Sequence, residues 1–185
     1  MKWLISVLMT VVMTIGSWLG LPCKTSDRMT NEEARILAAD ILERAEQIYD
    51  IMLAELPGDH ELVAILPNGM QVFRVGENPL GIYSIADLKA LVEKTYTKEY
   101  AQKMCGIDPD YCWTYYEEDG VLYFEENAGD SGESPDPSTA KVKSQTEDTL
   151  VLTMKYDREI SNNKVTWQLK WEDDAWKLDH SIWGY

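Results

Sequence analysis

The feature that most restricts the possible fold is a long stretch of helical periodicity that begins at Thr30. Thr30 and Glu33 have the spacing of a capping box, in which each side chain accepts a hydrogen bond from a free backbone N–H at the start of a helix. Apolar residues then recur every three or four positions as far as Leu53, and Pro57-Gly58 ends the pattern. A helix with one apolar stripe must bury that stripe against a sheet or other helices.

Two pairs of strands are marked by tight-turn sequences. Asn68-Gly69 lies between runs at 61–66 and 70–75, and Asp119-Gly120 lies between runs at 111–117 and 121–126. Both dipeptides favour the positive φ angles of a hairpin turn, so each pair of runs is expected to form a hairpin. Alternating apolar residues predict four more strands, at 140–144, 149–156, 164–172 and 175–182, with turns at Asn162-Asn163 and Asp173-Asp174.

Short helices are expected between the two hairpins. Ser84 and Thr97 are good N-cap residues, for one helix that ends near Lys94 and another over 98–104. With helices mostly first and antiparallel strands last, the order predicts an α+β domain over residues 30–185. Its long N-terminal helix and short helices are expected to pack on one face of a single curved antiparallel sheet, in a cystatin-like or hacksaw-like arrangement. The tryptophans at 167, 171, 176 and 183 are expected to pack in or against the core rather than form a sugar platform.

The amino terminus has the pattern of an export segment. Lys2 is followed by Trp3–Leu21, which carries no charge, as in a signal peptide. The same run is long enough to cross a bilayer as a helix, and Cys23 is a candidate for lipidation. Residues 1–23 are therefore predicted to be a signal peptide or a membrane or lipid anchor, with a linker at 24–29. The rest is expected outside the cytoplasm, secreted or held at the outer face of the cell membrane.

The cysteines fit an oxidising compartment. Cys105 and Cys112 are seven positions apart on either side of a turn, so they are candidates for a small-loop disulfide; two buried free thiols are the alternative. Cys23 is then acylated or removed with the signal peptide. The sequence has no Cys-x-x-Cys motif and no Cys/His cluster, and its aspartates do not have EF-hand spacing, so no metal is expected.

Negative charge is concentrated between Asp108 and Pro137. This stretch has ten acidic residues and no Lys or Arg, and the whole chain has a formal charge of −15. Such a field repels nucleic acid and attracts basic proteins or cations, although acidic residues also serve simple solubility. We expect the second hairpin to end in a mobile acidic loop at 127–138; a plain connector is the alternative. The candidate partner-binding residues are Glu125, Glu126, Asp130, Glu133, Asp136, Trp113 and Tyr123.

No constellation in the sequence points to catalysis or to a cofactor. Asp179-His180-Ser181 contains the residue types of a hydrolytic triad, but adjacent residues of a strand point to opposite faces and cannot relay a proton. There is no phosphate-binding loop and no dinucleotide motif. The sequence therefore favours a binding protein over an enzyme.

At Asp87–Met104, DLKALVEKTYTKEYAQKM, the chain resembles the IseA-type D,L-endopeptidase inhibitor family of bacterial cell-wall proteins. The chain is also similar to this family in its layout. It has an export segment, an early helix, a turn at 95–97, and an aromatic, strand-rich end with a Gly/Asp loop at 129–132. The resemblance implies a non-enzymatic protein, expected to be a monomer, whose partner is a cell-wall D,L-endopeptidase. Blocking the cleft of this cysteine enzyme would limit peptidoglycan autolysis.

Two other functions remain open at this point. One is an envelope-attached cystatin-like or nuclear-transport-factor-like domain that binds a small ligand in a pocket between the first helix and the sheet. A wide pocket holding an inward-facing carboxylate or His180 would favour it. The other is a domain that scaffolds an envelope complex.

Overall fold

The computed structural model describes residues 28–126, 133–156 and 163–183, and it has the predicted α+β class. The predicted export segment with Cys23, the first half of the predicted acidic loop (127–132, with Asp130) and Asn162 lie outside the described residues. Helices and strands follow one another as α2 (Asn31–Met52), β1 (His60–Ile65), β2 (Gln71–Val75), α3 (Ile85–Glu93), α4 (Lys98–Cys105), β3 (Tyr111–Cys112), β4 (Tyr115–Glu118), β5 (Val121–Glu125), β6 (Pro135–Gln145), β7 (Thr149–Tyr156), β8 (Lys164–Glu172) and β9 (Ala175–Leu178).

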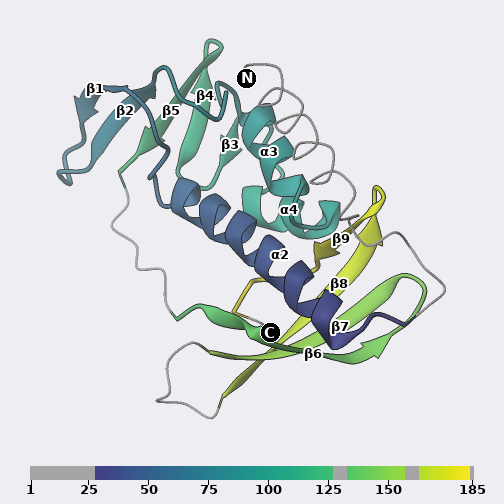
Figure 1. The fold of residues 1–185 in the computed structure, drawn as a ribbon. Coiled ribbons are helices and arrows are strands. Elements are labelled where there is room, and N and C mark those ends of the chain that lie inside the picture. The colour runs from purple at the N-terminus through teal and green to yellow at the C-terminus, as the bar shows by residue number, and fades with distance from the viewer. Residues whose placement is uncertain (1–27, 127–132, 157–162, 184–185) are drawn as a thin grey trace, which may run out of the picture.

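The strands form two antiparallel sheets, so the prediction of a single curved sheet is wrong. One sheet has five strands in the order β1-β2-β5-β4-β3, and the other has four in the order β6-β7-β8-β9. Figure 1 shows them at opposite ends of the molecule, with α2 running between them. Alternation along a strand identifies its buried face but not its neighbours, which is why the sequence did not reveal the division.

Helix α2 is attached to both sheets by its ends. At its start, the predicted capping box between Thr30 and Glu33 is present, and the Asn31 side chain accepts a 3.0 Å hydrogen bond from the backbone N–H of Val142 in β6. At its end, the Tyr115 hydroxyl donates to the carbonyl of Ile51 over 2.8 Å, beside the backbone hydrogen bond that this carbonyl accepts from Ala54. The apolar stripe between these ends is buried, as predicted.

One hydrophobic core extends along this helix from sheet to sheet. Trp167 and Tyr115, one from each sheet, are fully buried in it. Trp176 is also buried, and Trp171 and Trp183 pack partly exposed against the core, so the prediction that the late tryptophans serve packing is confirmed.

The short helices join the two halves. Ser84 and Thr97 cap α3 and α4 as predicted. Between these helices, the backbone of 95–97 pairs with β9, because Leu178 donates to Thr95 over 2.9 Å and Thr97 donates to Leu178 over 2.8 Å. Strand β9 ends at Leu178 rather than at 182 as predicted, and Ile182 beyond it is buried in the core.

Candidate functional site

Three tyrosines form a row across the five-stranded sheet. Tyr111 pairs in register with Tyr116, and Tyr116 pairs with Tyr123, so their side chains share one face of β3, β4 and β5. The rings are nearly parallel, with centroids 6.0 Å apart for the first pair and 5.3 Å for the second. Tyr111 is 52% exposed, and the other two are partly exposed. We call these three residues the tyrosine row.

Strand alternation explains why the row faces outward. Tyr115, Leu122 and Phe124 occupy the intervening positions and are buried in the core. Because successive residues of a strand point to opposite faces, Tyr116 and Tyr123 must lie on the other side of the sheet. The row therefore exposes large, partly polar rings that the core does not use.

Two carboxylates accompany the row. Burial, and then the negative charges of Glu125 and Glu118, raise the pKa of Tyr116 above the usual value for tyrosine, which places both acids near its ring. Within the described part of the chain, neither acid forms an ion pair. The next residue along the row is Arg74, which pairs in register with Tyr123 but is bound to Glu61. We call the tyrosine row with Glu118 and Glu125 the tyrosine face; it is aromatic and negatively charged.

The edge of this face is held by α3 and α4. The structure joins Cys105, at the end of α4, to Cys112 in β3 by a disulfide, the pairing expected from the sequence. Glu117, on the core side of β4, accepts a hydrogen bond of 3.1 Å from the backbone N–H of Ile85 at the start of α3. The disulfide therefore positions β3, which carries Tyr111, and the Glu117 hydrogen bond positions β4, which carries Tyr116.

The structure brings together only some of the predicted partner-binding residues. Tyr123 and Glu125 belong to the tyrosine face, and Glu126 follows directly, with its backbone N–H bonded to Gln71 of β2. Trp113 is 50% exposed in the turn between β3 and β4, where its φ of 58° reverses the chain. The predicted continuous strand at 111–117 is therefore wrong, because this turn divides it into two paired strands.

The other predicted acids lie elsewhere. Asp136 belongs to β6, where it pairs with Lys155 of the four-stranded sheet, and Glu133 lies just before this strand. The predicted loop at 127–138 therefore extends too far, since its last four residues are strand. Pro135 is the first residue of β6, an edge strand, and both of these are positions at which a sheet tolerates proline. Asp130 lies outside the described residues.

Sequence reasoning missed Tyr111, Tyr116 and Glu118 as site residues. A signal for two of them was available: the Asp119-Gly120 turn fixes the pairing of Glu118 with Val121 and hence of Tyr116 with Tyr123. Tyr111 had no such signal, because nothing in the sequence marks the turn at Trp113.

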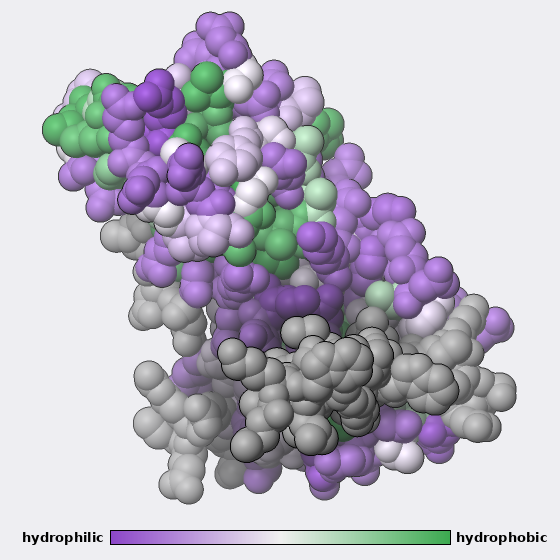
Figure 2. All heavy atoms as spheres, turned by 45° about the horizontal axis from the view of Figure 1, so that its top comes forward, coloured by the Kyte–Doolittle hydropathy of each residue, from purple (hydrophilic) through white to green (hydrophobic). Residues whose placement is uncertain are grey.

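A separate, apolar surface lies at the opposite edge of the five-stranded sheet, on β1. Leu62, Val63 and Ile65 of β1 are 48%, 44% and 66% exposed, and Figure 2 shows hydrophobic residues gathered at this end of the molecule. The register shift between Leu62 and Ala64 is a bulge, which makes a strand edge less suitable for pairing. This edge differs in character from the acidic tyrosine face.

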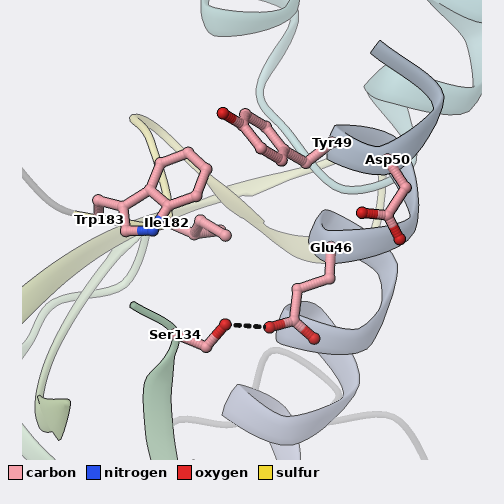
Figure 3. A pocket seen from close by; sticks show the side chains of 6 residues that line it. All are labelled: Glu46, Tyr49, Asp50, Ser134, Ile182 and Trp183. Atoms are coloured by element: carbon pink, nitrogen blue, oxygen red, sulfur yellow. Dashed lines mark hydrogen bonds between the residues drawn. The ribbon is translucent and has the colours of Figure 1, made fainter. Parts of the chain in front are cut away.

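A small acidic pocket lies where α2 meets the end of the chain, at Glu46, Tyr49, Asp50, Ser134, Ile182 and Trp183 (Figure 3). Ser134 donates a hydrogen bond to Glu46, and the rings of Tyr49 and Trp183 meet edge to face at 4.6 Å. Burial, together with the charges of Glu55 and Glu46, raises the pKa of Asp50. The pocket volume of about 130 Å³ is well below the roughly 300 Å³ of typical small-molecule sites, so it gives the ligand-binding alternative little support.

Both histidines are held by the backbone. His180 Nε2 accepts a 2.7 Å hydrogen bond from the N–H of Gln168, and its Nδ1 lies 2.6 Å from the carbonyl of Ser181, to which it donates as the neutral tautomer. His60 Nε2 lies 2.7 Å from the carbonyl of Leu56. The Asp179-His180-Ser181 sequence therefore does not place a hydroxyl and an imidazole in the relation that a triad requires.

The environment of His180 predicts a pH dependence of stability. Burial lowers the pKa of His180, although the Ser181 carbonyl and Asp179 partly oppose this. Below about pH 6.5 the unfolded chain binds a proton at this position more readily than the folded protein, so stability falls as the pH falls. Denaturant unfolding between about pH 7.5 and 5.5 should show this decline, and the slope should be smaller in a His180→Gln variant. An equal slope in both proteins would contradict the prediction.

Among the described residues, no group of three or more His, Cys, Asp or Glu side chains is placed to hold a metal ion. Within the same ranges, no helix has both the length and the apolar character needed to cross a bilayer. No known family model matches the chain, and no curated protein is recognisably similar to it.

Proposed function

We propose that this chain is an exported, non-enzymatic protein that binds a cell-wall D,L-endopeptidase and inhibits it, which limits peptidoglycan cleavage. The observation that carries the proposal is the tyrosine face. Tyrosine rings offer a large, rigid contact area with a polar tip, and aromatic residues are enriched in protein interfaces. Here three of them stand in register beside two carboxylates that form no ion pair with any described residue, on the side of the sheet that the core does not use.

The segment that carries the family resemblance lies beside this face. Residues 87–104 form most of α3, the turn at 95–97 and most of α4. The backbone N–H of Ile85, two residues before the segment, donates to Glu117, and Cys105, the residue after it, is bonded to Cys112 of β3. The segment most similar to the inhibitor family therefore lies between the two contacts that hold β4 and β3, the strands of Tyr116 and Tyr111.

Charge reversal at two places tests which surface binds the endopeptidase. The tyrosine face is changed by Glu118→Lys with Glu125→Lys, and the region before β6 by Glu133→Lys with Asp136→Lys. A control of equal charge change is Glu43→Lys with Glu55→Lys, two exposed acids outside both regions. The readout is inhibition of peptidoglycan cleavage by a D,L-endopeptidase.

We expect the tyrosine-face pair to weaken inhibition by about tenfold or more and the control pair by less than about twofold, because like charges across an interface cost far more than distant ones. If inhibition is weakened only in the Glu133→Lys, Asp136→Lys variant, the interface lies at the predicted acidic loop and not at the tyrosine face. A parent protein that inhibits no D,L-endopeptidase would overturn the proposed function.

A further inference from the structure

We infer that the tyrosine face binds a basic segment of the partner in which two positive charges stand about 14 Å apart, on either side of a contact with Tyr116 and Tyr123. This inference rests on the proposed function for the biological partner, but its chemistry can be tested separately. It follows from the register of β4 and β5 and from the charges that this register places around the row.

The register puts the two carboxylates on opposite sides of the row. Glu118 pairs with Val121, and Tyr116 pairs with Tyr123, so Glu118 lies two positions beyond the row at the turn end of the hairpin. Glu125 lies two positions beyond Tyr123 in the other direction. Four residues of strand at about 3.4 Å each, with one step between strands, separate the two acids by about 14 Å.

Charge determines which ligand this arrangement recognises. The nearest positive side chain along the row, Arg74, is bound to Glu61, so it does not neutralise Glu118 or Glu125. A carboxylate beside an exposed tyrosine ring attracts Lys or Arg both by ion pairing and by cation–π interaction. An extended segment carries side chains at positions i and i+4 about 14 Å apart, with position i+2 between them over the row.

The experiment uses two peptides of identical composition and a sugar. The first is N-acetyl-Arg-Thr-Val-Thr-Arg-amide, which has the required spacing, and the second is N-acetyl-Thr-Arg-Val-Arg-Thr-amide, in which the arginines are about 7 Å apart when extended. The third probe is chitotetraose, because exposed aromatic rows also bind glycans. Binding to the isotope-labelled protein is followed by shifts of the backbone amides of β4 and β5.

We expect the first peptide to bind about fivefold more tightly than the second, and its affinity to fall between about 50 and 300 mM salt. Glu118→Gln or Glu125→Gln should abolish the preference, whereas Glu43→Gln, a control on the exposed side of α2, should retain it. Equal binding of both peptides, an unchanged preference in both face variants, or amide shifts with chitotetraose alone would each overturn the inference.

The two proposals fail differently. If the spaced peptide binds as expected but the protein inhibits no D,L-endopeptidase, the proposed function is wrong and the basic-segment specificity stands. If the tyrosine face is needed for inhibition but the peptides are not distinguished, the inferred spacing is wrong and the proposed function stands.

Discussion

Tyr116→Ala is expected to weaken binding of the proposed endopeptidase partner by about 30- to 100-fold, the size of effect that a central aromatic anchor of an interface produces. Tyr116 lies in the middle of the row, with Tyr111 on one side and Tyr123 on the other. Its removal deletes both its own contact with the partner and the support of its two neighbours. The measurement is the dissociation constant of the complex by calorimetry or surface plasmon resonance.

Two further variants separate the role of Tyr116 in binding from its role in stability. Tyr83→Ala removes a tyrosine that is 51% exposed, much like Tyr111, but lies outside the row, so it should leave the affinity within about twofold of the parent. Tyr116→Phe keeps the stacked ring and should retain most of the affinity. A Tyr116→Ala protein that remains folded and binds as well as the parent would rule out the row as the centre of the interface.

Removing the disulfide with Cys105→Ala and Cys112→Ala is expected to lower the free energy of unfolding by about 2 to 3 kcal/mol, the loop-closure entropy of so short a loop. Both cysteines are buried, and alanine avoids placing a hydroxyl without a partner in the core. The measurement is denaturant unfolding under oxidising conditions. The parent protein in reducing agent serves as the control and should lose a similar amount.

The same variant should also weaken partner binding, because the disulfide holds the strand that carries Tyr111. The expected loss is smaller than that of Tyr116→Ala, since Tyr116 and Tyr123 remain paired in β4 and β5. A double variant as stable as the oxidised parent would show that α4 and β3 are held together by packing alone.

Local signals in the sequence predicted local structure well. The capping box at Thr30 and Glu33, and the hairpin at Asp119-Gly120, are present as expected. Asp173 and Asp174 both adopt the positive φ angles of the predicted tight turn, at 52° and 59°. Each of these features depends on residues within four positions of one another, so its physical cause is contained in the sequence window that shows it.

Features that depend on distant residues were not predictable in the same way. The division into two sheets depends on which strands pair, and strand alternation is the same in either arrangement. The tyrosine row depends partly on a turn at Trp113 that no Gly, Asn or Asp marks. The sequence groups the candidate acids because they are close along the chain, whereas the structure places Glu125 in the five-stranded sheet and Asp136 in the four-stranded sheet.

The attachment of α2 to both sheets has a consequence for folding in the cell. The first turn of this helix bonds to Val142, 111 positions later in the chain, and Met29 bonds to Gln145, 116 positions later. Contacts between such distant positions form late, because a long loop must close before they contribute. The apolar stripe of α2 therefore stays partly uncovered until β6 has been synthesised, so this helix is the segment on which a chaperone would act.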